Sequence, residues 1–192
     1  MQADWEVEIG GEAPVIDAHW HGFIDLRCFP NRVSEISEIQ KLPALADALV
    51  LLNAADSPVW TAKCDVWAVS DSTLDRFELD AAPEAAAHAI ACYIDMLPRS
   101  DQQWNDPQCA VVFCKELCSR LQSLPRRCCR IDLIVRSALT APGMNNLGIT
   151  AYLSACGSSE ARACSQLEGA LAAFVDALVP SASPASGPSR IK

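Results

Sequence analysis

The residues best suited to chemistry stand near the N-terminus, in the run DAHWH at positions 17–21. Two histidines at positions i and i+2 of a β-strand point the same way, so both imidazoles could reach one Zn²⁺ at about 2.0 to 2.1 Å. Asp17 would then bind the metal or orient a histidine, with Asp65 or His88 as a further ligand. The pattern predicts a candidate metal site at Asp17, His19 and His21, with a divalent metal as cofactor.

The longer string VIDAHWH, residues 15–21, resembles the first-strand motif of amidohydrolase-type metal hydrolases. The resemblance implies that His19 and His21 bind a metal. That family folds as a (β/α)8 barrel of about 250 residues with further histidine ligands. This chain is shorter, with 192 residues and 3 histidines. A small metal-dependent hydrolase, in which the metal activates a water molecule, is one candidate function.

The 10 cysteines form the second group of interest. Cys114 and Cys118 stand at helical spacing on an apolar stripe, and no two cysteines have the C-x-x-C spacing of zinc or redox motifs. Most cysteines are therefore expected to fill the core. Cys128 and Cys129 are the exception, because arginines surround them and positive charge lowers the pKa of a thiol. They are candidate reactive thiols, and a thiol-dependent activity is a further hypothesis.

Hydrophobic periodicity predicts the elements that position these residues. Alternation predicts strands at 15–28, 59–69, 129–139 and 147–156, and a weaker strand at 5–9 that a turn at Gly10-Gly11 would pair antiparallel with 15–28. Apolar residues at helical spacing predict helices at 33–52, broken near Pro43, at 83–98, at 107–124 and after 157–160. The predicted order is β-β-α-β-α-α-β-β-α.

Alternating strands of this kind predict a largely antiparallel or mixed sheet of about five strands with helices on one face. The expected fold is an α+β two-layer sandwich. One domain is expected over residues 1–179, followed by a Pro/Ser-rich tail, 180–192, that we expect to be disordered.

The other face of this sheet would collect polar side chains of both signs. That mixture is typical of cross-strand ion pairs on a solvated sheet, and it also suits a shallow groove that binds a ligand or partner. The candidate ligand or partner face consists of Asp25, Arg27, Lys63, Asp65, Arg130, Asp132, Arg136 and Tyr152.

The formal net charge of −9 is unevenly distributed: residues 1–106 carry −13 and residues 107–192 carry +4. The basic half could meet the acidic half within one domain or in a second copy. An acidic chain with few aromatics among its basic residues predicts no nucleic-acid partner. The first 11 residues lack a basic and an apolar signal region, and no apolar run reaches about 20 residues, so we expect a cytoplasmic protein without a membrane span.

Besides the thiol-dependent activity, two functions follow from these patterns, and the sequence leaves open whether the chain is an enzyme. The first is a cytosolic, non-catalytic α+β module that binds a protein partner or self-associates through its polar sheet face. The alternative is the small metal-dependent hydrolase that would use Asp17, His19 and His21.

Overall fold

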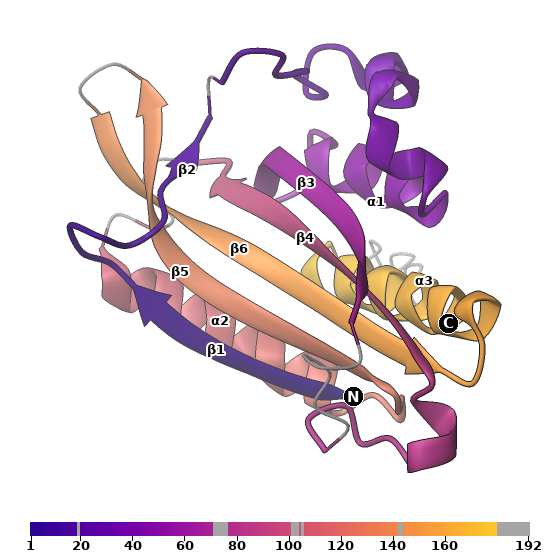
Figure 1. The fold of residues 1–192 in the computed structure, drawn as a ribbon. Coiled ribbons are helices and arrows are strands. Elements are labelled where there is room, and N and C mark those ends of the chain that lie inside the picture. Colours follow the sequence, from indigo (N-terminus) through magenta and orange to yellow (C-terminus); the bar gives the residue numbers. More distant parts are fainter. Residues whose placement is uncertain (19, 71–76, 101–103, 105, 142–143, 180–192) are drawn as a thin grey trace, which may run out of the picture.

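A mixed sheet with helices on one side forms the fold of the described residues, 1–18, 20–70, 77–100, 104, 106–141 and 144–179, in the computed structural model. The strand order is β1-β5-β6-β4-β3, and the short β2 also pairs with β5 (Figure 1). β1 and β2 run parallel to β5, whereas the β3–β4, β4–β6 and β5–β6 pairs are antiparallel. This arrangement confirms the predicted α+β fold.

The bounds of the elements agree with several sequence predictions. The strands are β1 (Gln2–Glu8), β2 (Ile16–Asp17), β3 (Val59–Val69), β4 (His88–Pro98), β5 (Cys129–Ala141) and β6 (Met144–Gly157). The helices are α1 (Ala44–Asn53), α2 (Pro107–Gln122) and α3 (Glu160–Leu178). Asp106 and Ser159 cap α2 and α3 by accepting hydrogen bonds from the first-turn amides of Cys109 and Arg162.

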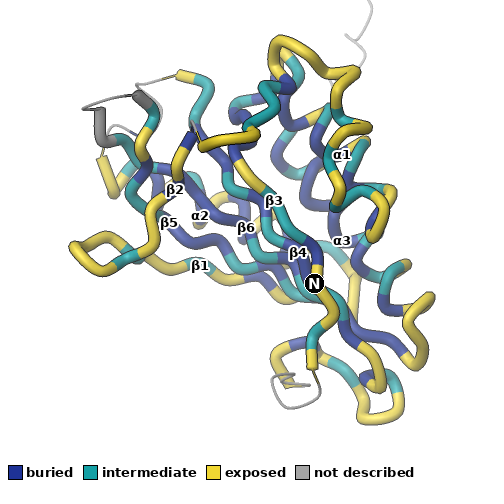
Figure 2. The backbone as a smooth tube through the Cα atoms, turned by 45° about the horizontal axis from the view of Figure 1, so that its top comes forward, coloured by how far each residue is buried: buried dark blue, intermediate teal, exposed yellow. Residues whose placement is uncertain are grey.

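The main hydrophobic core lies between the sheet and the three helices. It includes Leu49 of α1, Leu117 of α2, Phe174 of α3 and Leu133 of strand β5. The central strands are buried and the connecting loops are largely exposed (Figure 2). The opposite side of the sheet carries no helix of the described chain, and we call it the uncovered face (Figure 1). In the described part, no helix combines the length and apolar character that a membrane crossing requires.

The predicted helix at 83–98 is wrong. A single 3₁₀ turn at Pro83–Ala85 leads into β4, which is hydrogen-bonded to β3 on one side and β6 on the other. Alanine favours helices intrinsically, but tertiary pairing overrides that weak preference. The apolar residues Ile90, Cys92, Ile94 and Met96 alternate and face the core.

The predicted strand at 15–28 is wrong over most of its length. Only Ile16 and Asp17 pair, with β5, and the chain then turns around Gly22, whose φ is +93°. The predicted antiparallel pairing of residues 5–9 with this strand is wrong too, since β1 and β2 both pair in parallel with β5. We call residues 20–29 the cover segment, because they pass over the β3 end of the sheet.

The predicted helix at 33–52 is divided. Two 3₁₀ turns, Pro30–Glu35 and Ser37–Gln40, precede α1, which begins directly after Pro43. The break at this proline confirms that prediction, because proline cannot donate the hydrogen bond that a continuous helix would need. The tail at 180–192 lies outside the described residues.

Candidate functional site on the uncovered sheet face

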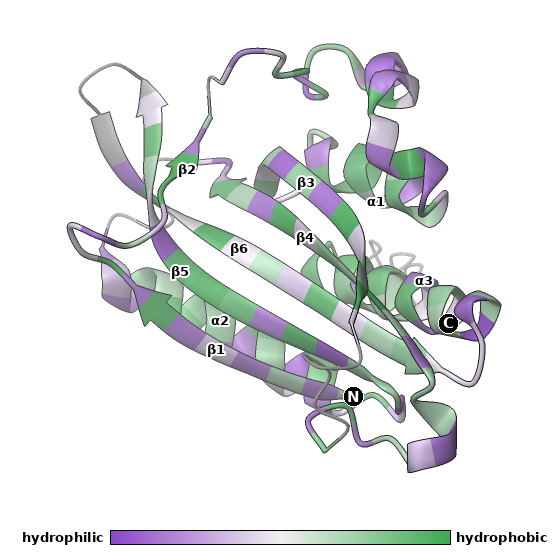
Figure 3. Ribbon diagram, in the orientation of Figure 1, coloured by the Kyte–Doolittle hydropathy of each residue, from purple (hydrophilic) through white to green (hydrophobic). Residues whose placement is uncertain are grey.

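Two rows of side chains cross the uncovered face from edge to edge. Residues paired in register on neighbouring strands lie on the same side of a sheet. The first row is Asp4, Asp132, Tyr152, Tyr93 and Asp65, on β1, β5, β6, β4 and β3. The second row is Glu6, Ile134, Thr150, Asp95 and Lys63. Hydrophilic and hydrophobic residues alternate along β3, as two-sided packing requires (Figure 3).

Aromatic rings occupy the middle of this face. Tyr93 and Tyr152, the chain's 2 tyrosines, are cross-strand partners with ring centroids 5.8 Å apart. Trp67 of β3 lies 6.1 Å from Tyr93 and 6.4 Å from Tyr152. Trp67 is exposed and both tyrosines are half-buried, so the cluster packs internally and still presents surface to solvent.

A half-buried carboxylate lies beside these rings. Asp95 Oδ1 accepts a 2.6 Å hydrogen bond from Thr150 Oγ1, and none of the ion pairs within the described ranges includes Asp95. Burial raises the pKa of Asp95 above its usual value, and the Thr150 hydrogen bond and the charges of Arg136 and Lys63 offset part of that shift. Asp95 is therefore an acidic group with unused capacity to pair with a cation.

Arg136 lies close by, but its charge is already used within the chain. Its Nη2 donates to Glu8 Oε2 at 2.9 Å, and its Nη1 donates to Thr150 Oγ1 at 3.3 Å and to the Tyr152 hydroxyl at 3.4 Å. The guanidinium also lies 5.5 Å from the centroid of the Tyr152 ring. Arg136 thus orients Tyr152 and fixes the edge strand β1.

Carboxylates dominate the field around Tyr93. Burial, followed by the charges of Asp95 and Asp65, raises the pKa of Tyr93 to about 12. The nearby thiol of Cys64 has its pKa raised to about 12 by burial first and then by Glu38, Asp65 and Asp95. Both groups lie in the negative field of Asp65 and Asp95, which favours a cationic ligand.

A hollow of about 280 Å³ lies over these residues. Lys63, Tyr93, Asp95, Arg136 and Tyr152 line it from the sheet, and residues Pro14, Val15, Asp17 and Trp20 form its rim. We call it the tyrosine groove. Two hollows of about 320 Å³ share residues with it: one shares Trp20, Lys63 and Tyr93 and lies at the β3 edge, and the other shares Tyr152 and extends to Asp4 and Glu6.

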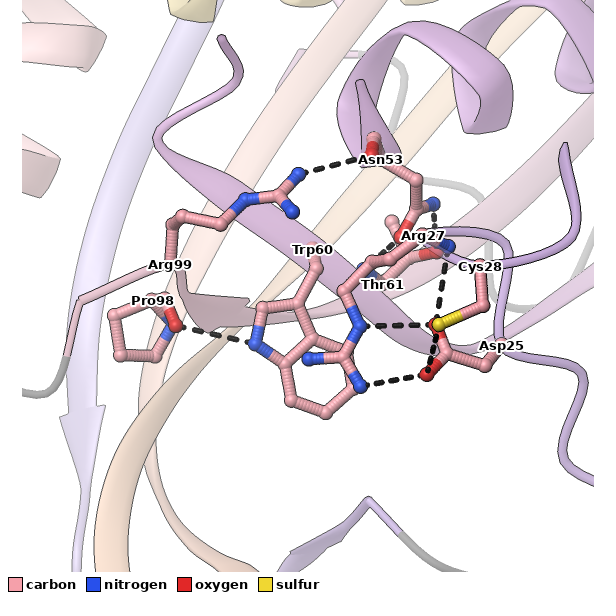
Figure 4. A network of polar contacts seen from close by, with 8 residues as sticks. All are labelled: Asp25, Arg27, Cys28, Asn53, Trp60, Thr61, Pro98 and Arg99. Carbon is pink, nitrogen blue, oxygen red and sulfur yellow. Dashed lines mark hydrogen bonds and ion pairs between the residues drawn. The ribbon is translucent and has the colours of Figure 1, made fainter. Parts of the chain in front are cut away.

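The cover segment closes one end of the sheet. Trp20 Nε1 donates to Ala62 O at 3.0 Å, and the Arg27 guanidinium stacks 3.7 Å from the centroid of Trp60. Arg27 also forms two side-chain hydrogen bonds with Asp25, and Trp60 Nε1 donates to Pro98 O at 3.1 Å (Figure 4). These contacts hold the rim of the groove against β3.

Six of the predicted ligand-face residues lie together on the uncovered face, and two do not. Asp25 and Arg27 belong to the cover segment, where they pair with each other over Trp60. The six on the uncovered face are Lys63, Asp65, Arg130, Asp132, Arg136 and Tyr152.

Of the predicted metal site, Asp17 and His21 lie within the described residues. The strand that would point two histidines the same way ends at Asp17, and His21 lies exposed in a turn. His19 lies outside the described residues. No group of three histidine, cysteine or carboxylate side chains within the described ranges is placed to hold a metal ion.

The candidate thiols Cys128 and Cys129 differ in accessibility. Cys129 is 1% exposed and points into the main core, and burial raises the pKa of its thiol. Cys128 is half-buried and precedes β5. The main-core positions of Cys114 and Cys118 confirm the packing role predicted for them.

The basic half of the chain meets the acidic half within the same molecule. Arg130 forms ion pairs with Asp4 and Glu78 besides Asp132, and Arg127 forms one with Asp80. Together with the Arg136–Glu8 pair, these contacts place the charge compensation inside the chain.

Four residues of this face were not predicted from the sequence: Tyr93, Asp95, Trp67 and Glu8. Tyr93 and Asp95 fall within the predicted helix at 83–98, yet their alternation with Cys92 and Ile94 is a strand signal.

Comparisons with protein-family models, with curated proteins and with solved structures give no match for this chain.

Proposed function

We propose that the chain is a non-catalytic binding module whose uncovered face holds an extended, basic segment of a partner protein. The observation that carries this proposal is the juxtaposition of the Trp67–Tyr93–Tyr152 cluster with Asp95, a carboxylate without an ion pair in the described chain. Aromatic rings beside carboxylates bind alkylammonium and guanidinium groups through cation–π and ionic contacts.

The dimensions of the face suit an extended segment. Neighbouring strands lie about 4.8 Å apart, so the path from β1 to β3 spans about 19 Å, the length of about six extended residues. The three hollows share Tyr93 or Tyr152 and follow this path across the strands. A segment lying along it would place alternate side chains toward the sheet.

The sheet edges are less suited to a partner than the face. At the free edge of β3, Trp20 donates to Ala62 O and Lys41 Nζ donates to Val66 O at 2.8 Å. At β1, Gln122 donates to Ala3 O at 2.8 Å. Such contacts occupy backbone groups that an added strand would need. Arg130 and Arg136 already have carboxylate partners within the chain, so they do not need carboxylates of a second copy.

The test measures binding of a fluorescent six-residue peptide that alternates arginine and serine, with a glutamate–serine peptide as its counterpart. We expect the basic peptide to bind, more weakly at high salt, and the acidic peptide not to bind. Asp95→Asn or Trp67→Ala should weaken binding by about tenfold, the equivalent of about 1.4 kcal/mol.

Matched variants separate this site from general attraction to an acidic protein. Asp47→Asn removes the same charge from an exposed position on α1, and Phe29→Ala removes an exposed ring outside the groove. Both should leave the affinity unchanged. If Asp47→Asn weakens peptide binding as much as Asp95→Asn does, the proposed binding site on the uncovered face is wrong. If light scattering shows a dimer of the wild type that dissociates on Trp67→Ala, the occupant of the face is a second copy of the chain and not a partner protein.

A further inference from the structure

Cys128 and Cys156 face each other at the end of the β5–β6 hairpin, on the opposite end from its loop. Cys129 pairs with Ala155 in the ladder, and one step further Cys156 N donates to Cys128 O at 2.9 Å. Directly opposed residues of an antiparallel pair have Cα atoms about 4.5 to 5.5 Å apart. That separation lies within the range of about 4.4 to 6.8 Å that a disulfide bridges.

The two side chains also meet. Cys156 is fully buried in a small cluster with Leu79, Ala86 and Ala89, and the half-buried Cys128 packs against the same cluster. Burial, followed by the neighbouring Cys128 thiol, raises the pKa of Cys156 to about 11. Cys128 has a φ of +59°, a left-handed conformation that is uncommon for residues with a side chain.

We infer that Cys128 and Cys156 are a redox pair that closes into a cross-strand disulfide when the chain meets a hydroperoxide. This site is independent of the binding function proposed above. Cys128 is the thiol that reacts first, because it is the more accessible of the two. Cys156 is positioned to resolve the product.

The chemistry needs one equivalent of the peroxide. The thiolate of Cys128 attacks the peroxide, the O–O bond breaks, and a sulfenic acid forms with release of water or an alcohol. The sulfur of Cys156 then attacks the sulfenic sulfur, forms the S–S bond and releases water. Two electrons pass from the two thiols to the peroxide, and a thiol reductant reverses the reaction.

The bond would join two positions that the fold already holds together. The segment containing Leu79 and Ala86 packs on Cys156 and so covers the place where the bond would form. Since a cross-link constrains the unfolded chain more than the folded one, the oxidised protein should unfold at a higher temperature.

The test treats the reduced, full chain with hydrogen peroxide, alkylates the remaining thiols and maps the peptides by mass spectrometry. We expect loss of two hydrogen atoms and a Cys128–Cys156 linked peptide, and restoration of both thiols by dithiothreitol. Cys28→Ser is the control, because Cys28 is exposed and should not be needed. Cys156→Ala should instead leave Cys128 as sulfenic or sulfinic acid.

Three results would overturn the inference. The first is a Cys128–Cys129 bond in the wild type, and the second is overoxidation of Cys128 without a link to Cys156. The third is loss of the Cys128–Cys156 linked peptide in Cys28→Ser. Circular dichroism of each reduced variant checks folding. Were Cys156→Ala unfolded, trapping of the wild-type sulfenic acid with dimedone would decide, since rapid resolution by Cys156 predicts little trapped adduct.

Discussion

Thr150 lies between Asp95 and the nearest guanidinium on the uncovered face. Its hydroxyl donates a 2.6 Å hydrogen bond to Asp95 and accepts one of 3.3 Å from Arg136. The arginine is thereby held one hydroxyl away from the carboxylate, while its Nε and Nη2 donate to Glu8. Asp95 keeps a hydrogen bond but has no ion pair with the described residues, and burial determines the direction of its pKa shift.

Replacing Asp95 with asparagine should stabilise the fold at neutral pH. The raised pKa means that the ionised carboxylate is less stable in the folded chain than in the unfolded one. This cost is absent when Asp95 is protonated in both states, and it grows as pH rises from the unfolded pKa of about 3.9 through the folded pKa. Asn can still accept from Thr150, so Asp95→Asn should raise the free energy of unfolding at pH 7 by up to about 1 kcal/mol.

Urea denaturation at pH 7 and at pH 3 measures this effect. The variant and the wild type should differ at pH 7 and agree within error at pH 3. A less stable variant at pH 7 would mean that the carboxylate stabilises the fold. The same substitution is expected to weaken peptide binding, so stability and binding should change in opposite directions, as is common at functional sites.

The sequence was most informative where one face of an element is buried. Strand β3 was predicted at its observed bounds, because Val59–Val69 alternates and ends at turn residues. Even there, an irregularity in pairing between Thr61 and Lys63 shifts the alternation, so that Thr61 bonds to Asn53 on the helix side. Periodicity does not reveal such a shift.

The central groove residues were missed for a different reason. The alanine-rich flank at 81–91 outweighed the alternation of Tyr93 and Asp95 with Cys92 and Ile94. The opposite error arose at 15–28, where alternation continues although the chain leaves the sheet. There, the hydrogen bond from Trp20 to Ala62 and the stacking of Arg27 on Trp60 depend on partners far along the chain.

Asn53 joins helix α1 to strand β3, and its loss should be costly. It is 4% exposed, donates to Leu49 O and Thr61 Oγ1 at 2.8 and 2.7 Å, and accepts from Thr61 N at 3.1 Å (Figure 4). Asn53→Ala leaves the buried amide and hydroxyl of Thr61 without these partners. The expected loss is about 2 to 3 kcal/mol of unfolding free energy.

Guanidinium denaturation of Asn53→Ala measures this loss. Asn146→Ala on the β5–β6 hairpin, which removes a side-chain hydrogen bond to Thr140 at a less buried position, should cost less. A change below about 0.5 kcal/mol for Asn53→Ala would show that water replaces the lost contacts.

Gly157 is required for the close approach of α3 to the end of β6. A Cβ at this position would lie 2.5 Å from the backbone nitrogen of Ala163 and 2.8 Å from the carbonyl carbon of Arg162. Because both atoms are backbone, the start of α3 must move to admit a methyl group. Gly157→Ala should lower stability by about 1 to 3 kcal/mol.

Gly10→Ala is the matched control, since nothing lies within 4 Å of a Cβ at that position. Thermal unfolding of the two variants compares them directly. Equal melting temperatures would show that α3 adjusts without cost.

Arg27 secures the cover segment through its planar guanidinium, which stacks on Trp60 and binds Asp25 with two nitrogens. Lysine keeps the charge but offers neither the flat surface nor the paired donors. Arg27→Lys should therefore reduce stability by about 1 kcal/mol at pH 7 and speed proteolysis within residues 20–29.

The hydrogen bond from Arg27 is the main cause of the lowered pKa of Asp25. The stability that this pair contributes is therefore present above about pH 4 and declines as Asp25 becomes protonated below its folded pKa. Arg32→Lys provides the comparison, because Arg32 binds Glu35 on the surface and its replacement should change stability less than Arg27→Lys does. If the two substitutions have equal effects at pH 7, Arg27 contributes no more than a surface ion pair.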